Sequence, residues 1–222
     1  MIYPDAIWRP TGKHGYGSDD THLRQGMVFH SMEGSLAGAF GRMDIPLDAS
    51  NPYTQASWTF SVAKDGRVYQ HADTDDITWT NGSYEANKRF WGVENEGRAG
   101  EPLTEPQYQG LLGLVRWIYP AHGLGFVRQQ TAWEHNEMGR FGSAATACPS
   151  GRIPWERLLT DFNMEDDMTP EEHERLVNTE NAVARLEAAS ARNEQGREDI
   201  KAMLQELSAV IEAHGRTGSH SH

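Results

Sequence analysis

The distribution of aromatic residues divides this sequence into two unlike parts. All seven Trp and all seven Tyr lie before residue 156, and the last Phe is Phe162. Large aromatic side chains contribute much of the area that a hydrophobic core buries, and the remaining chain has none of them. We therefore predict one globular domain over residues 1–160, long enough to bury a core, followed by a segment of a different kind.

Charge is shared unevenly between these two parts. The whole chain has a net charge of −12, and residues 161–222 carry 14 acidic and 6 basic side chains, which leaves −4 for the first 160 residues. An acidic balance argues against nucleic acid and anionic lipid as partners, because both attract basic surfaces. No apolar run approaches the length of about 18 residues that spans a bilayer, so we expect no membrane insertion.

The second part reads as a helical tail. Residues 161–168 are polar and acidic and predict a linker, and the helix start that follows has a capping box with proline in the first turn. Apolar residues then recur at seven-residue spacing over 169–214 around a polar centre that contains Gly196. We expect a short coiled coil that could join copies of the chain, or else a solvated helix or a hairpin bent at Gly196. Residues 215–222 are expected to be disordered.

Short apolar runs and turn signals predict an α/β class for the first part. Residues 64–66, Lys-Asp-Gly, favour a tight turn between strands at 57–62 and 67–70. A helix with one apolar face is expected from the cap Thr104 to residue 118, ended by Pro120 and Gly123. Further strands at 26–30 and 90–94 and a short helix at 33–42 complete the prediction. This alternation favours a central mixed β-sheet flanked by helices.

Cys148, the only cysteine, could be a small apolar filler, a nucleophile or a metal ligand. His30 ends an apolar strand, where a buried imidazole needs a hydrogen-bonding or metal partner. His135 follows an apolar pair and precedes the glycine-rich stretch that leads to Cys148. Two histidines and a cysteine form a set that Zn²⁺ accepts, with the fourth position left open for water. Gaps this long constrain little by themselves, and a hydrogen-bonded core histidine is the alternative for His30.

Six sequence blocks extend this pattern. They are VFHS (28–31), SWTFSVAKDGRVYQ (57–70), WGVENEG (91–97), LTEPQYQGLLGLVRWI (103–118), EHNE (134–137) and TACPSGRIPW (146–155). In these blocks, over residues 22–160, the chain resembles the type 2 N-acetylmuramoyl-L-alanine amidases, which include phage lysins, bacterial amidases and animal peptidoglycan recognition proteins. The resemblance implies a central sheet flanked by helices, with zinc held by His30, His135 and Cys148 at the floor of a groove for the peptidoglycan stem. It also implies cleavage of the amide between N-acetylmuramic acid and L-alanine.

Glu94 is our candidate for the carboxylate that moves protons in that reaction. It matches the first acidic residue of a GIELEG-like motif in bacterial members of the resembled family. Glu96 competes with it, because residues two apart on a strand point to the same face. The alternative for Glu94 is a surface side chain paired with Arg89 or Arg98.

Two residues depart from the pattern of the resembled family. Trp58 stands where many relatives have a tyrosine; if it faces the zinc, its N–H can donate to an oxyanion but cannot shuttle a proton. Thr146 stands where some relatives have a lysine, and it can donate a hydrogen bond to the substrate carbonyl without supplying a positive charge. Trp79, Tyr84 and Asn87 could line the groove and bind substrate, although a tryptophan is as readily a core residue.

The leading hypothesis is therefore a zinc-dependent amidase of bacterial peptidoglycan that acts as a phage lysin. No signal peptide is visible, so we expect accumulation in the host cytoplasm and release to the wall through a holin. Two alternatives belong to other classes: a module that binds muramyl peptides without cleaving them, and a virion-associated protein whose tail docks into a particle. The tail itself favours homo-oligomerisation over wall binding, because it has no aromatic residues to hold glycans.

Overall fold

The computed structural model describes residues 1–15, 24–164, 204–205 and 208. The chain divides into two units, Met1–Met164 and Glu165–His222, and the first is described below. Apart from residues 204, 205 and 208, the predicted tail over 169–214 and the predicted disordered end over 215–222 lie outside the described residues, as does the linker beyond residue 164. Among the described residues, no helix has the length and apolar character needed to cross a membrane.

Six strands form one mixed sheet in the order β1-β4-β3-β5-β2-β6. Strand β2 pairs in parallel with β5 and β6, and β5 pairs in parallel with β3. The turn at residues 64–66 joins β3 and β4 as an antiparallel pair, as predicted. The strands are β1 (Ile7–Trp8), β2 (Gly26–Ser31), β3 (Phe60–Val62), β4 (Val68–Gln70), β5 (Phe90–Asn95) and β6 (Ala132–Glu134). The predicted mixed sheet flanked by helices is confirmed, although β1 and β6 were not expected.

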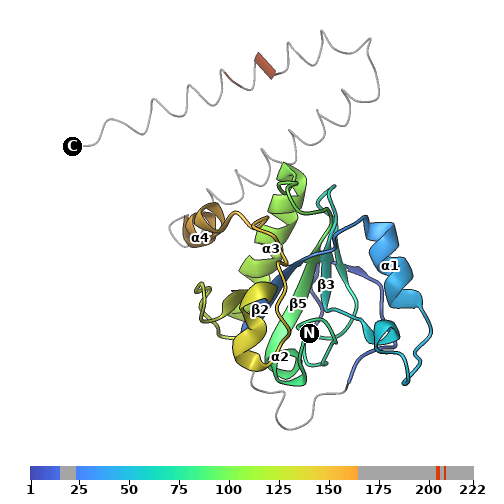
Figure 1. The fold of residues 1–222 in the computed structure, drawn as a ribbon. Coiled ribbons are helices and arrows are strands. Elements are labelled where there is room, and N and C mark those ends of the chain that lie inside the picture. The colour runs from blue at the N-terminus through green and yellow to red at the C-terminus, as the bar shows by residue number, and fades with distance from the viewer. Residues whose placement is uncertain (16–23, 165–203, 206–207, 209–222) are drawn as a thin grey trace, which may run out of the picture. The chain divides into compact units, whose positions relative to one another are not determined.

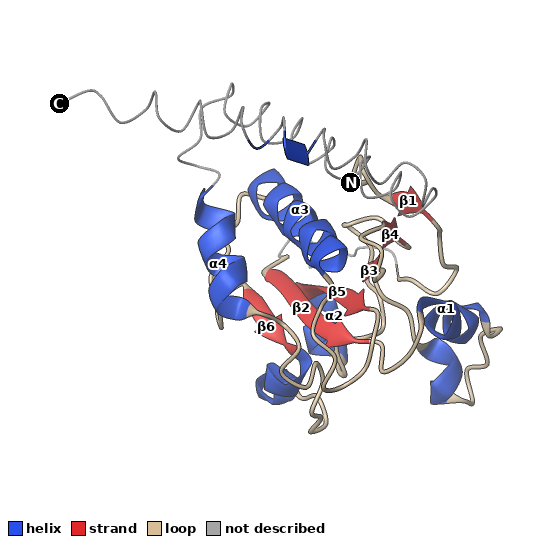
Figure 2. Cartoon of the chain, turned by 90° about the horizontal axis from the view of Figure 1, so that it is seen from above, coloured by secondary structure: helices blue, strands red, loops and turns tan. Residues whose placement is uncertain are grey.

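Helix α3 (Glu105–Ala121) covers one face of the sheet with α4 (Trp155–Met164), as Figure 2 shows. The hydroxyl of Thr104 accepts a hydrogen bond from the Gln107 amide and caps α3 as predicted. The four residues expected on its apolar face are completely buried, namely Leu111, Leu114, Val115 and Ile118. They pack against Phe29, Phe60 and Val93 of the central strands.

Helix α3 and the first domain both extend beyond their predicted ends. Pro120 lies inside α3, because a proline near the end of a helix removes only its own amide donor, and the His122 amide still donates to Ile118. Residues 161–164 were assigned to the acidic linker but continue α4. The reason is that Phe162 packs against the core beside α3.

The opposite face of the sheet carries shorter elements. These are α1 (Leu36–Asp44), the 3₁₀ helices η1 (Pro52–Gln55) and η2 (His135–Phe141), and α2 (Tyr84–Arg89). Figure 1 shows the sheet between α3 and α1. On this face Ser61, Glu94 and His30 occupy neighbouring positions of β3, β5 and β2, because they are paired in register. The short elements cover this face, so that Ser61 and His30 are buried and Glu94 is partly exposed.

Candidate metal centre and active site

His30, His135 and Cys148 converge on one point beside the sheet. One ligand atom from each lies within 4.8 Å of the others, and the His30 Nδ1 to Cys148 Sγ distance is 3.8 Å. A tetrahedral zinc ion with Zn–N of about 2.0 Å and Zn–S of about 2.3 Å holds such atoms about 3.3 to 3.6 Å apart. The three side chains therefore fit a divalent metal of this kind with little movement.

A hydrogen-bond chain fixes the tautomer of His30. The Asn81 amide nitrogen donates to the Phe90 carbonyl at 2.8 Å, so the Asn81 oxygen must be the atom that lies 3.0 Å from His30 Nε2. That oxygen can only accept, and His30 Nε2 therefore carries the proton. The Nδ1 lone pair is left facing Cys148. Burial, with the nearby His135 second, lowers the pKa of His30 to about 3, which keeps the imidazole neutral and able to bind a metal.

His135 comes from the first turn of η2 and is held by a different contact. Its Nε2 lies 3.4 Å from the Ser143 hydroxyl, which also donates to the Ala144 carbonyl. Gly82 packs against this pair, since a Cβ there would lie 1.9 Å from Ser143 Oγ and 3.0 Å from His135 Nε2. Burial lowers the pKa of His135 as well. Both histidines are thus uncharged at neutral pH.

Cys148 is placed by the loop that follows η2. The Ser31 amide donates to its sulfur at 3.3 Å, and buried Arg152 ties the loop to Ser31 Oγ and to the Asn95 and Glu96 carbonyls. Burial, with the nearby Glu94 carboxylate second, raises the pKa of Cys148 to about 12. A lone nucleophile would need a lowered pKa, so this setting supports a ligand, whose thiolate a bound cation would stabilise.

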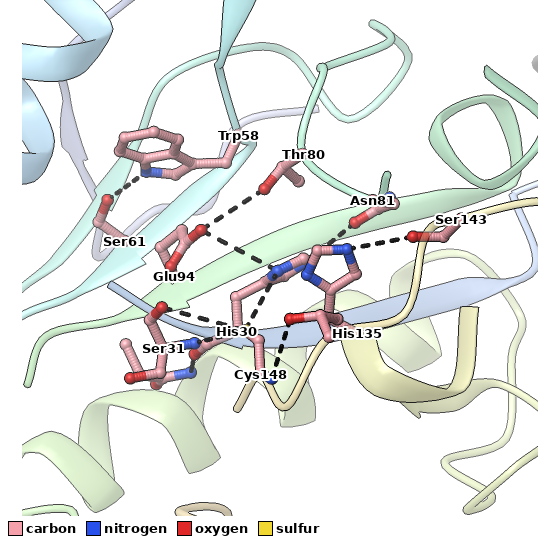
Figure 3. A network of polar contacts seen from close by, with 12 residues as sticks. His30, Ser31, Trp58, Ser61, Thr80, Asn81, Glu94, His135, Ser143 and Cys148 are labelled. Atoms are coloured by element: carbon pink, nitrogen blue, oxygen red, sulfur yellow. Dashed lines mark hydrogen bonds and ion pairs between the residues drawn. The ribbon is translucent and has the colours of Figure 1, made fainter. Parts of the chain in front are cut away.

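Glu94 and Glu96 have separate surroundings. Glu94 Oε1 lies 4.0 Å from His30 Nδ1 and accepts from the Thr80 hydroxyl at 3.5 Å (Figure 3). Its Oε2 is buried and has no hydrogen-bond partner among the described residues. Burial raises the pKa of Glu94 to about 7. Glu96 instead uses its two oxygens to accept from the Leu36 and Lys64 amides. Glu94 is therefore the carboxyl beside the histidines, and Glu96 supports two loops.

A cavity of 680 Å³ opens beside Glu94, and Trp79, Tyr84 and Asn87 are among the residues that line it. The rings of Trp79 and Tyr84 are stacked with their centroids 6.2 Å apart, and Tyr84 is 56% exposed. Asn87 is buried, and its side-chain oxygen accepts from the Thr80 and Asn81 amides. The first two offer an aromatic surface to a ligand, whereas the Asn87 oxygen holds the loop that contains Asn81.

Trp58 also lines the cavity, but its N–H is already used. Trp58 Nε1 donates to Ser61 Oγ at 2.7 Å, and Ser61 Oγ lies 2.8 Å from His71 Nε2. His71 Nδ1 donates to the Arg9 carbonyl at 2.7 Å, so Nε2 accepts the Ser61 proton. The expected donation from Trp58 to an oxyanion is thus replaced by a directed chain that holds the indole in place. The sequence does not single out Ser61 or His71, because each lies among ordinary strand and loop residues.

Thr146 lies beside Cys148 but is not among the residues that line the cavity. Its hydroxyl oxygen accepts from the Cys148 amide at 3.2 Å, which leaves the hydroxyl proton to donate elsewhere. Asn81 and Ser143, by contrast, contact the two histidines, and Arg152 anchors the Cys148 loop; none of the three was expected. The only sequence signals for them were proximity: Asn81 follows Trp79 closely, and Ser143 and Arg152 flank Cys148.

Comparison with known proteins agrees with this geometry. The family model described as N-acetylmuramoyl-L-alanine amidase matches residues 21–151. A comparison with curated proteins found no match. Among solved structures, a selenomethionine derivative of AmpD is 18% identical, with a TM-score of 0.56 over 72% of this chain and 96% of that chain. AmiA of Staphylococcus aureus is 18% identical, with a TM-score of 0.53 over 72% and 78%. The endolysin LysCS of Clostridium intestinale is 16% identical, with a TM-score of 0.51 over 73% and 97%. These three likenesses concern the fold.

Proposed function

This chain belongs to the N-acetylmuramoyl-L-alanine amidase family and is an amidase of peptidoglycan, and we propose that it works with a zinc ion held by His30, His135 and Cys148. The observation that carries the proposal is the convergence of these three side chains within 4.8 Å, beside Glu94 and an open cavity. When bound there, zinc would polarise the scissile carbonyl and lower the pKa of its water to about 7.

Glu94 is the proton carrier in this proposal. Its carboxyl lines the cavity, and a pKa of about 7 lets it accept a proton from water and return one to the departing amine near neutral pH. The Thr80 hydroxyl steadies one oxygen and leaves the other without a partner among the described residues. Thr146, whose hydroxyl donates to no partner among the described residues, is the proposed donor to the substrate carbonyl. Trp58, Trp79 and Tyr84 form the aromatic walls against which the substrate lies.

The test is a cleavage assay on isolated bacterial cell walls with and without a chelator. We expect new N-terminal L-alanine in the presence of metal and none after chelation. Glu94→Gln should reduce the rate by about 10²- to 10⁴-fold while keeping metal affinity. New reducing sugar without new amines would refute the amidase and indicate a glycosidase. Full activity of Cys148→Ala would remove that residue from the ligand set.

We further propose that the enzyme acts as a phage lysin, released from the host cytoplasm through a holin. The name endolysin carried by the structurally similar LysCS supports this role. Expression in the cytoplasm should leave cells intact until a holin is co-expressed, and lysis without one would contradict the proposed release. A module that binds muramyl peptides without cleaving them, the alternative raised by the sequence, would bind wall fragments with the same affinity in wild type and Glu94→Gln and would release no alanine from either.

A further inference from the structure

Arg42 is the only cation among the described residues that line the cavity, and Glu94 is the only anion. It lies in the last turn of α1, whereas Tyr84 and Asn87 line the cavity from α2. The Arg42 guanidinium stacks over the Tyr53 ring with its central carbon 3.7 Å from the ring centroid. Such stacking holds a guanidinium plane while its N–H groups remain available at the edge.

The neighbouring carboxylates do not neutralise this guanidinium. In the described part of the chain, no carboxylate forms an ion pair with Arg42, and the nearest acid in sequence, Asp44, pairs with Arg9 at 2.7 Å. The positive charge of Arg42 acts on Glu94 at longer range and opposes the rise of its pKa. A cation that lines an open cavity and pairs with no carboxylate of the described residues is suited to a ligand anion.

The platform beneath Arg42 is itself held firmly. Tyr53 belongs to η1, whose start is capped by the Asn51 side chain accepting from the Tyr53 amide at 3.1 Å. Buried Thr54 accepts from the Asp48 amide and donates back toward the same loop. Tyr53 is 54% exposed, so its ring is a surface group on which the guanidinium stacks rather than part of the core. The Tyr53 ring thus preorganises Arg42, which lines the cavity, and this reduces the entropy lost on binding.

The two ends of the cavity differ in chemistry. The α2 side presents the stacked Trp79–Tyr84 pair and no charged lining residue, whereas the α1 side presents the guanidinium. Aromatic faces suit sugar rings and apolar groups, and a guanidinium suits a planar carboxylate in a bidentate pair. A substrate with a sugar at one end and a carboxylate-bearing peptide at the other therefore has one favoured direction in this cavity.

We propose that Arg42, supported by Tyr53, binds a free carboxylate of the stem peptide and so selects acidic over amidated stems. This inference rests on the proposed amidase function, because it assumes a stem peptide in the cavity. It assigns the peptide to the α1 side and the sugar to the Trp79–Tyr84 side. Arg42 is thus a specificity-determining residue that touches substrate away from the scissile bond.

The test compares two stem peptides that are identical except that a side carboxyl is free in one and an amide in the other. Binding to the full-length protein is measured by tryptophan fluorescence or calorimetry, so the result does not depend on cleavage. We expect wild type to bind the acid about tenfold or more tightly than the amide, as a charged hydrogen-bonded pair predicts. Arg42→Gln should lose that preference, because only the affinity for the acidic peptide falls. Arg42→Lys should keep part of the preference, because lysine supplies a point charge without the planar, bidentate guanidinium.

Arg67→Gln is the matched control, since Arg67 is exposed, pairs with Asp65 and lies outside the cavity. It removes the same net charge and should leave the preference unchanged. Equal weakening of acid and amide in Arg42→Gln, or an unchanged preference, would overturn the inference. A parallel cleavage assay on muramoyl peptides separates the two proposals. If wild type does not cleave the amide but still prefers the acidic peptide in an Arg42-dependent way, the proposed amidase reaction is refuted and the carboxylate subsite is supported.

Discussion

At the scale of single residues, Asn81 decides which nitrogen of His30 faces the proposed metal. Asn81→Leu removes the acceptor for His30 Nε2–H, and we expect zinc affinity to fall by about 10- to 100-fold, as for other supports of metal ligands. Asn81→Asp keeps an acceptor for that N–H but loses the donation to the Phe90 carbonyl. It should bind zinc nearly as well as wild type while unfolding at a lower temperature. Competition with a chromophoric chelator measures the first effect and thermal unfolding the second. Equal zinc affinity in wild type and Asn81→Leu would contradict this role.

Glu94 links the site to the stability of the metal-free protein. Its pKa is raised from 4.5 to about 7, so the folded state favours the neutral carboxyl. The stability that this contributes is present below pH 4.5 and is lost as the pH rises through about 7. Glu94→Gln is neutral at every pH and should match wild type at pH 4.5 but exceed it at pH 8 by about 3 kcal/mol, at about 1.4 kcal/mol per pKa unit. Urea unfolding at the two pH values, with chelator present, measures the difference. A gap that does not change with pH would show that Glu94 ionises freely in the folded chain.

The sequence identified the residues that carry the proposed chemistry, but not the residues that hold these side chains in position. His30, His135 and Cys148 could be named because their residue types match a ligand set, and the structure brings them within 4.8 Å. Trp58 could be named, but the use of its N–H by Ser61 could not, because that depends on the register of β3. Asn81, whose role depends on a loop folding back onto β2, has no sequence signal beyond its closeness to Trp79.

At the scale of elements, Arg152 joins the Cys148 loop to the ends of β2 and β5. This buried side chain donates to Ser31 Oγ and to the Asn95, Glu96 and Glu101 carbonyls. Arg152→Met would remove all four hydrogen bonds and leave the Ser31 hydroxyl and the Glu101 carbonyl without this donor, and we expect a loss of about 3 kcal/mol or more in the free energy of unfolding. Zinc affinity should fall as well, because the loop holds Cys148.

Arg152→Lys provides the intermediate case, since one ammonium cannot reach four acceptors in the geometry of a planar fork. Arg98→Gln is a matched control, being an exposed arginine close to the same strand end. Denaturant unfolding of the three variants measures the stability, and chelator competition measures the metal affinity. Wild-type values of both quantities in Arg152→Met would show that the loop holds its position without this side chain.

The elements that could be predicted are those whose pattern is local. The Asp-Gly turn predicted the β3–β4 hairpin, and Thr104 with four apolar residues predicted α3. Strands β1 and β6 have two and three residues and exist only because β4 and β2 offer free edges, so their sequences contain no strand-length pattern. Helix α2 is also short, with six residues after the Ser83 cap. The end of α4 was missed because Phe162 acts through tertiary packing, not through its acidic neighbours.

At the scale of the whole molecule, the heptad pattern over residues 169–214 predicts association of the full chain, whereas residues 1–164 form a unit with its own core and contain every candidate site residue. We expect a truncated chain of residues 1–164 to cleave muramoyl peptides like the full chain. In sedimentation velocity the full chain should be oligomeric and the truncated one monomeric. Replacing Val183 and Leu186 by aspartate should make the full chain monomeric, because both stand at apolar heptad positions.

The salt dependence of oligomerisation distinguishes association through apolar heptad positions from association through opposite charges. Residues 161–222 carry a net charge of −8, so like charges oppose their association while the apolar heptad positions favour it. At 0.15 M ionic strength charges are screened over about 8 Å and at 1 M over about 3 Å, and the dissociation constant of the oligomer should therefore fall as salt is added. An oligomer that dissociates in high salt would instead be held by opposite charges, and a full chain that is monomeric at every salt concentration would remove the tail as an oligomerisation element.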